Sequence, residues 1–167
     1  MTATFDDLIA ANRSYATGFE LGELHAAAAS GLAVLTCIDS RIEPLPMLGL
    51  RPGDAKIVRN AGARATDDAI RSLVFATNLL GVRRIMVLAH TDCAMAGSTD
   101  EQLLAKLSEH HHGVDYAGFE PHAATDQLAT LAADVERLRT SPLLADHVEV
   151  EGFVYDVRTG LVTPAGD

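Results

Sequence analysis

The chain has 167 residues, of which 48% are hydrophobic and 22% charged, so it has a globular composition and enough length to bury one core. Its formal net charge of −10 argues against a nucleic acid or an anionic membrane as a partner, because phosphate groups attract basic proteins. The longest apolar runs are far shorter than the roughly 18 to 20 residues that span a bilayer, and the first residues lack a secretory signal pattern. We therefore expect one domain, residues 1–167, in the cytoplasm.

The first part of the chain contains one helix pattern followed by two strand patterns. Residues 4–15, TFDDLIAANRSY, place apolar side chains at helical spacing behind Thr4, the expected N-cap, with acids in the first turn. Residues 31–40 and 54–62 contain short apolar runs rich in Val or Ile and bounded by Gly and Asp, which is typical of buried strands. These patterns predict an amphipathic helix ahead of a sheet.

A helix and a third strand are predicted next. Residues 66–81 carry apolar side chains on one helical face, with Thr66 as the expected N-cap and Gly81 as the end of the helix. Residues 83–90, RRIMVLAH, form a further short apolar run and predict a strand.

The last part of the chain predicts two more helices and a terminal pair of strands. In residues 98–111, Ser98 and Glu101 have capping-box spacing ahead of a leucine-rich helix. Residues 125–142 repeat the helical pattern, and residues 147–164 alternate as a strand and hairpin. Strands that alternate with helices form parallel sheets through right-handed crossovers. The expected fold class is α/β: a mainly parallel sheet flanked by helices, with an antiparallel C-terminal strand or hairpin and an N-terminal amphipathic helix.

Three potential metal ligands fall at one edge of this predicted sheet. Cys37 ends the first strand, His90 ends the third, and Cys93 follows three residues later. Ligands of parallel sheets bind beyond the carboxyl ends of the strands, and two thiolates with one imidazole suit zinc with an open fourth position. The residues alone leave other interpretations open: packed thiols beside a core histidine, a Cys–His nucleophilic pair, or a redox pair.

Two charged residues lie immediately beyond the first strand. In CIDSR, Asp39 and Arg41 follow Cys37 by two and four positions. Asp39 could be a fourth metal ligand or could orient water on the metal, and a bidentate pair with Arg41 would keep the carboxylate ionised. The alternative is a solvated surface ion pair.

The motifs CIDSR, RNAG and HTDC, in this order and spacing, resemble the β-class carbonic anhydrase family, particularly its short microbial members. The resemblance implies one zinc ion per chain held by Cys37, His90 and Cys93, beside an Asp39–Arg41 dyad. It also implies a homodimer or a dimer of dimers, a homotetramer, with active sites near the subunit interface. The implied reaction is reversible hydration of CO2 to bicarbonate and a proton by hydroxide on the zinc.

Asp39 can be satisfied either by zinc or by Arg41, which suggests a gate. In the blocked state Asp39 would be the fourth zinc ligand, and in the open state it would turn to Arg41 and admit water. Two other functions stay open: hydrolysis of carbonyl sulfide or carbon disulfide, which the family resemblance also implies, and zinc binding without catalysis.

The sequence suggests a substrate pocket and one departure from the family. The CO2 wall is expected to include Ile38, Ala61 and the backbone at Gly62. Ala94 stands where the family usually has Gly after the second cysteine, which would cost about 1 kcal/mol if the backbone there needs a positive φ. Proton transfer to solvent has candidates chosen only because imidazole titrates in the required range: His110, His111, His112 and His122.

Overall fold

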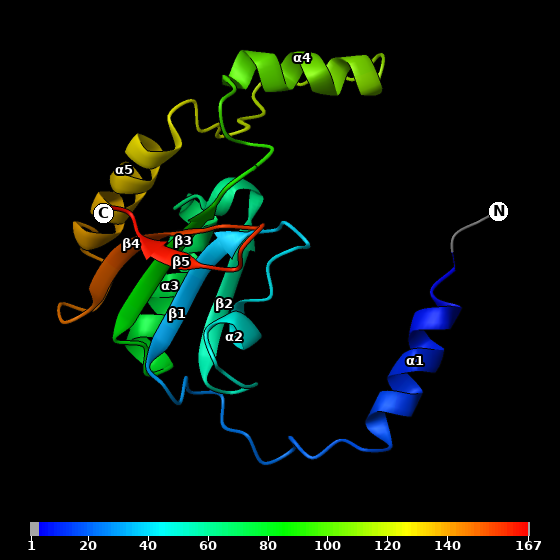
Figure 1. Cartoon of the computed structure of the whole chain (residues 1–167), viewed down its shortest axis with the longest axis vertical. Coiled ribbons are helices and arrows are strands. Elements are labelled where there is room, and N and C mark those ends of the chain that lie inside the picture. The colour runs from blue at the N-terminus through cyan, green and yellow to red at the C-terminus, as the bar shows by residue number, and fades with distance from the viewer. Residues whose placement is uncertain (1–3, 167) are drawn as a thin grey trace.

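A computed structural model describes residues 4–166 and shows the expected α/β architecture (Figure 1). Five strands form one sheet in the order β2-β1-β3-β4-β5. The first four strands are parallel, and β5 pairs antiparallel with β4. The strand bounds are β1 Leu32–Cys37, β2 Ala55–Asn60, β3 Arg84–His90, β4 Glu149–Tyr155 and β5 Val162–Pro164.

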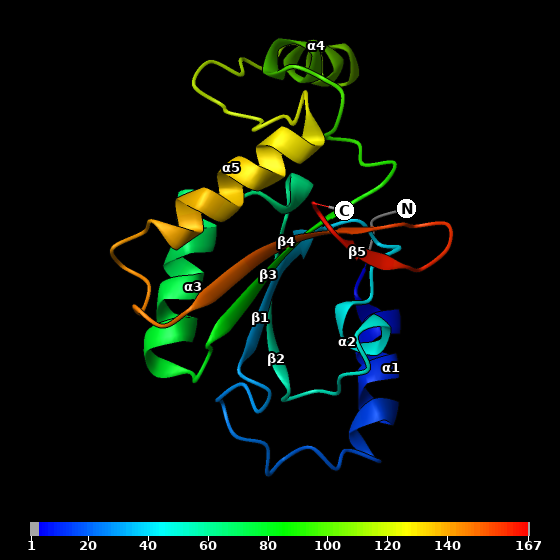
Figure 2. The same ribbon diagram turned by 60° about the vertical axis from the view of Figure 1, so that its left-hand side comes forward.

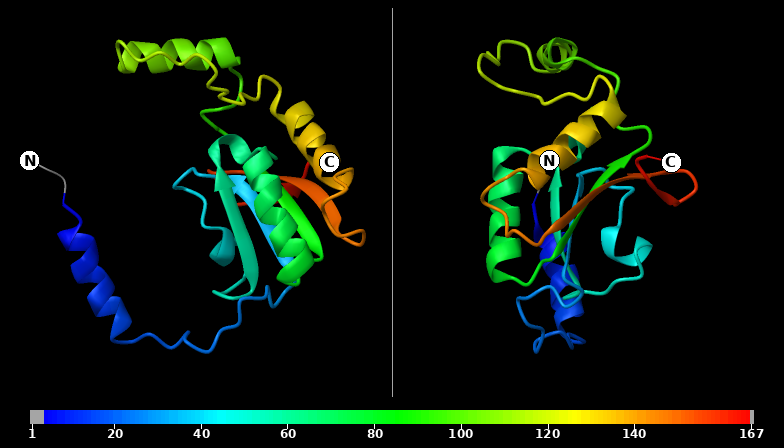
Figure 3. Two further views of the ribbon diagram at one scale, coloured as in Figure 1. Left: turned by 180° about the vertical axis from the view of Figure 1, so that it is seen from behind. Right: turned by 90° about the vertical axis from the view of Figure 1, so that its left-hand side faces the viewer.

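Helices cover both faces of the sheet, as the sequence predicted. Helices α3 and α5 lie on one face, α2 lies on the other, and α1 and α4 project away from the sheet (Figures 2 and 3). The short α2, which the sequence did not predict, occupies the proline-containing segment and has proline in its first turn. The bounds are α1 Asp6–Ala16, α2 Pro44–Met47, 3-10 turn η1 Ala61–Ala63, α3 Asp67–Leu79, α4 Asp100–His110 and α5 Gln127–Arg139.

Strand β1 lies at the centre of the core and is buried along its whole length. Since successive side chains of a strand point to opposite faces, Ala33 and Leu35 join the core under α3 and α5. Leu32 and Val34 pack on the other face with Met47 of α2. This continuous burial explains why the strand reads as an unbroken apolar run.

The helix caps match the prediction at α3 and correct it at α1. The Thr66 side chain accepts a hydrogen bond from the backbone N–H of Ala69 and so caps α3, as expected. At α1 the N-cap is Phe5, which makes no side-chain cap hydrogen bond, so the assignment of Thr4 as the cap was wrong. Helix α1 therefore begins one residue later than predicted, with Asp6 in its first turn.

The capping box of α4 exists, but one residue beyond the predicted pair. Thr99 and Gln102 exchange side-chain to backbone hydrogen bonds of 3.3 and 2.9 Å. Ser98 is buried and its carbonyl accepts from the Thr125 hydroxyl at 3.0 Å, so Ser98 belongs to the preceding loop rather than to the helix start. The box predicted from Ser98 and Glu101 was therefore wrong in register.

Helix α1 buries none of its residues in its own chain. The apolar side chains of the helix and its N-cap are open to solvent, with 74% of the N-cap Phe5 and 60% of Tyr15 exposed. Figures 1 and 3 show the helix standing away from the sheet at the end of an extended segment. Within residues 4–166, no helix has the length and apolar character needed to cross a membrane.

Candidate metal centre

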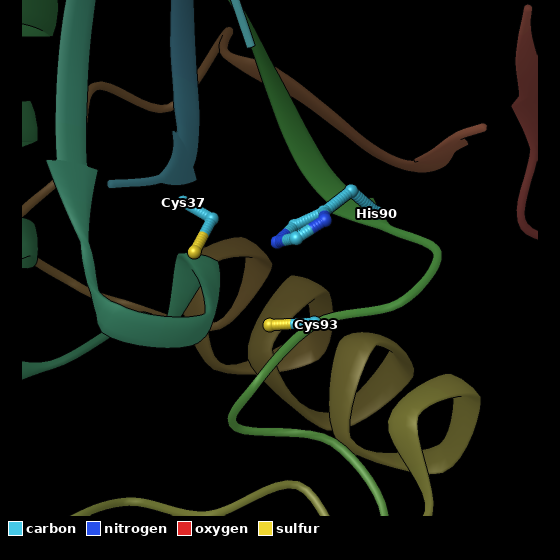
Figure 4. Close-up of side chains that lie close together, drawn as sticks. All are labelled: Cys37, His90 and Cys93. Atoms are coloured by element: carbon cyan, nitrogen blue, oxygen red, sulfur yellow. The ribbon is translucent and has the colours of Figure 1, made fainter. Parts of the chain in front are cut away.

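The side chains of Cys37, His90 and Cys93 converge beyond the carboxyl ends of β1 and β3 (Figure 4). Their ligand atoms all lie within 4.8 Å of one another, and all three residues are buried. Cys37 is the last residue of β1 and His90 the last of β3. Because these strands are parallel neighbours, their carboxyl ends meet, and the loop after β3 brings Cys93 to the same place.

The histidine ring is arranged to offer one nitrogen to a cation. His90 Nδ1 lies 2.9 Å from the carbonyl oxygen of Thr91, to which it donates its proton. His90 Nε2 is buried and has no hydrogen-bond partner within the described chain. A buried polar atom left without a partner is costly. A zinc ion held by this nitrogen and two thiolates would remove that cost, so the residues fit the metal.

Neighbouring groups stabilise a thiolate at Cys37. The Cys93 thiol lowers the pKa of Cys37 most, and the backbone N–H of Gly62 lowers it further by donating to the sulfur at 3.4 Å. The Cys37 thiolate in turn raises the pKa of Cys93. These contacts therefore favour the thiolate form of Cys37, which is the form of cysteine that binds a metal.

Asp39 and Arg41 form the bidentate pair that the sequence suggested. Arg41 Nε donates to Asp39 Oδ1 at 3.0 Å, and Nη2 donates to Oδ2 at 2.8 Å. These hydrogen bonds from Arg41 hold the pKa of Asp39 well below its usual range. Asp39 Oδ2 also lies 3.9 Å from His90 Nε2. The carboxylate thus lies beside the unpartnered nitrogen of His90 while it is hydrogen-bonded to Arg41.

Two residues near this pair were not assigned a role from the sequence. Arg59, in the RNAG motif, donates to the carbonyl oxygens of Cys37 at 2.9 Å and Asp39 at 2.6 Å, and so braces the backbone after β1. Asp92 accepts from Arg41 Nη1 at 2.9 Å. The position of Arg59 was predictable from the sequence, because parallel pairing of the first two predicted strands places RNAG beside CIDSR.

The predicted pocket residues are only partly brought together. Ala61 lines an apolar cavity of about 340 Å³ with Met95 and Phe119. Gly62 has a φ of 82°, which other residues rarely adopt, and a Cβ there would lie 3.2 Å from the Cβ of Met95, so both the backbone and the close approach favour glycine. Ile38 does not line this cavity, and 62% of it is exposed. Its place in a substrate wall stays a prediction.

The alanine that replaces the expected glycine causes no backbone strain. The non-glycine residues with positive φ within residues 4–166 are Ala63, Asp92 and His122, and Ala94 is not among them. The exchange therefore needs no left-handed backbone at position 94. The histidines considered for proton transfer are all exposed: His110, His111, His112 and His122.

Comparison with known proteins identifies the family. The carbonic anhydrase family model matches residues 32–162. β-Carbonic anhydrase 1 of Mycobacterium tuberculosis is 37% identical over 160 residues, covering 96% of each chain, and a carbon disulfide hydrolase of Acidianus sp. is 34% identical over 77% of this chain and 74% of its own. The crystal structure of a carbonic anhydrase from Streptococcus mutans superposes with a TM-score of 0.90 at 36% identity, covering 99% of this chain and 100% of that one. The chain belongs to the β-carbonic anhydrase family.

We expect replacement of either cysteine to remove the metal. Cys37→Ser and Cys93→Ser should each lose stoichiometric zinc, since an alcohol is a poor substitute for a thiolate ligand. Elemental analysis of purified variants measures this, and His110→Ala, which changes an exposed histidine, is the control that should keep its zinc. Unchanged zinc in both cysteine variants would refute the site.

Proposed function

We propose that the chain catalyses reversible hydration of CO2 to bicarbonate and a proton, with one zinc ion held by Cys37, His90 and Cys93. The observation that carries the proposal is the buried, unpartnered Nε2 of His90, which faces two thiols beside an ionised carboxylate. When bound there, zinc would supply a nucleophile at neutral pH by lowering the pKa of water.

In this proposal Asp39 orients the nucleophile by accepting a hydrogen bond from it. Asp39 Oδ1 accepts from the backbone N–H and Nε of Arg41, whereas Oδ2 accepts a single bond from Nη2. Oδ2 therefore keeps an acceptor position free, and it is the oxygen nearer His90. Arg41 keeps the carboxylate ionised and hydrogen-bonded to its guanidinium, which leaves the fourth metal position for the reaction.

The neighbouring cavity suits a small uncharged substrate. Most of the side chains that line it are apolar, among them Ala61, Met95 and Phe119, and Lys106 and His110 also line it. The apolar side chains can pack against a linear triatomic molecule that carries no net charge, which fits CO2. Carbonyl sulfide and carbon disulfide share that shape, so their hydrolysis is the second candidate function. The 34% identity to a carbon disulfide hydrolase supports this second candidate function.

A paired assay on zinc-loaded protein distinguishes CO2 hydration from hydrolysis of carbonyl sulfide or carbon disulfide. We expect stopped-flow measurement of CO2 hydration to give a rate well above that of sulfide release from carbonyl sulfide or carbon disulfide. Cys37→Ser protein measures the background for both reactions. Rapid sulfide release with CO2 hydration at background would decide for the hydrolase, and background rates for all three substrates would decide for zinc binding without catalysis.

Removing Arg41 should impair turnover while sparing metal. In Arg41→Ala, Asp39 loses its two hydrogen bonds from the guanidinium and keeps only the one from the backbone N–H of residue 41, so it becomes free to turn to the fourth position on zinc. We expect a fall in kcat for CO2 of more than about tenfold, because an exposed ion pair alone contributes at most about 1 kcal/mol, or roughly fivefold.

The matched control for Arg41→Ala is Arg71→Ala. Arg71 forms an exposed pair with Asp68 on α3, at 2.9 Å, with 66% of the Arg71 side chain exposed. Its loss should leave kcat and zinc content unchanged. Normal zinc and wild-type CO2 hydration in Arg41→Ala from pH 6 to 9 would reject the role given to Arg41.

We also propose that the chain forms a homodimer or a dimer of dimers through α1. The helix presents Phe5, Leu8 and Ile9 to solvent, and its own chain covers none of them. Contiguous apolar side chains of this kind mark interaction surfaces, and a second copy of the chain is the partner that is always present.

Disrupting the apolar side of α1 should therefore dissociate the assembly. We expect wild-type protein to sediment as a dimer or larger at micromolar concentration and Ile9→Asp to shift it towards the monomer, because a carboxylate would be buried in the contact. Arg13→Gln, a polar change on the same helix, is the control. A wild-type monomer that is stable, zinc-loaded and active would contradict the proposal.

A further inference from the structure

The guanidinium of Arg41 donates hydrogen bonds on two sides, and Asp39 is the acceptor on only one of them. On the other side, Nη1 donates to Asp92 Oδ2 at 2.9 Å and Nη2 donates to the Asp92 carbonyl oxygen at 3.0 Å. Together with the two hydrogen bonds to Asp39, these contacts engage the donors on both sides of the planar guanidinium. Its orientation is thus fixed between two segments of chain, the one after β1 and the one after β3.

The backbone at Asp92 is shaped for this contact. Asp92 has a φ of 57° and lies between His90 and Cys93 in the loop after β3. The left-handed region is rarely adopted by residues other than glycine, asparagine and aspartate. In this conformation the side-chain carboxylate and the carbonyl oxygen of one residue both reach the same guanidinium. The contact therefore links the segment that carries a thiol ligand to the orientation of Asp39.

A single exposed pair would not fix so long a side chain. The Arg41 side chain is 43% exposed and that of Asp92 is 64% exposed, so each ion pair alone is weakly held. Arg41 bound only to Asp39 could move with it, and the pair could swing together towards the metal ligands. A second anchor in another segment removes that freedom.

We propose that Asp92 is a positioning residue that anchors Arg41, so that Arg41 in turn keeps Asp39 off the metal. The inference rests on the proposed zinc site. Asp92 acts through Arg41 and Asp39 rather than on the substrate. Its loss should raise the fraction of protein in which Asp39 occupies the fourth metal position, and so weaken the binding of any other ligand there.

The test is azide binding to cobalt-substituted protein, followed by visible absorbance, because azide needs the same open position. Asp92→Gly removes the side chain without straining a left-handed backbone. We expect its azide affinity to fall by about three- to tenfold. Asp92→Asn, which tolerates this backbone and keeps an acceptor for Nη1, should lie closer to wild type. Asp146→Gly, a change at another exposed aspartate, should match wild type.

The sign of the effect separates this proposal from simple charge removal. Deleting a negative charge near the metal would by itself strengthen the binding of an anion, whereas release of Asp39 weakens it. A second comparison uses the Asp39→Asn background, in which the neutral amide competes poorly for the metal. There, Asp92→Gly should cause no loss of azide affinity.

Three results would overturn the proposal. The first is unchanged or tighter azide binding in Asp92→Gly with full metal content. The second is an equal loss of affinity in the Asp39→Asn background, which would indicate a distorted loop. The third is loss of cobalt from both Asp92 variants, which would make Asp92 a support for the ligands themselves. Because azide replaces the substrate, a wild-type protein that binds cobalt but does not hydrate CO2 would refute the proposed reaction and leave this comparison valid.

Discussion

The parallel register of β1 with its two neighbours brings together the strand ends on which the candidate metal centre is built. Cys37 pairs with Asn60 of β2, and Thr36 pairs with Leu88 of β3, so the three strands end at one level. The buried Thr36 hydroxyl donates to the Leu88 carbonyl oxygen at 3.0 Å and adds a side-chain contact to that register. Since side chains alternate along a strand, a slip of one residue would turn Cys37 to the opposite face, away from His90.

Polar contacts from α5 hold the other side of the centre. Gln127 donates to the His90 carbonyl oxygen at 3.0 Å, and Arg64 Nε donates to Asp134 Oδ2 at 2.6 Å. Asp134 is buried, with 7% of its side chain exposed, and breaking such a pair by removing one partner typically costs about 3 to 5 kcal/mol. Because Arg64 directly follows η1, this pair fixes the turn that contains Gly62, whose N–H donates to the Cys37 sulfur. The ligand geometry is therefore supported from β1, β3 and α5 together.

The parts of this structure that were predictable from the sequence are those with a local cause. Strand burial, helix periodicity and the Thr66 cap depend on neighbouring residues, and the meeting of the ligands followed from the rule for parallel sheets. The capping box was ambiguous because Ser98 and Thr99 both begin a suitable motif, and only the loop contact of Ser98 decides between them. The contact between Arg41 and Asp92 joins residues 51 positions apart and depends on a left-handed backbone at Asp92. No local sequence pattern predicts either feature.

The short length and the exposure of helix α1 determine when this segment can become a stable helix. It has 11 residues and buries none of them in its own chain, whereas isolated helices shorter than about 12 to 15 residues are marginal in water. Its helical state therefore gains no tertiary support until another surface covers it. In the proposed dimer, ordering of this helix and docking of the second copy would form one linked equilibrium, so the helix content of the N-terminal segment would depend on protein concentration.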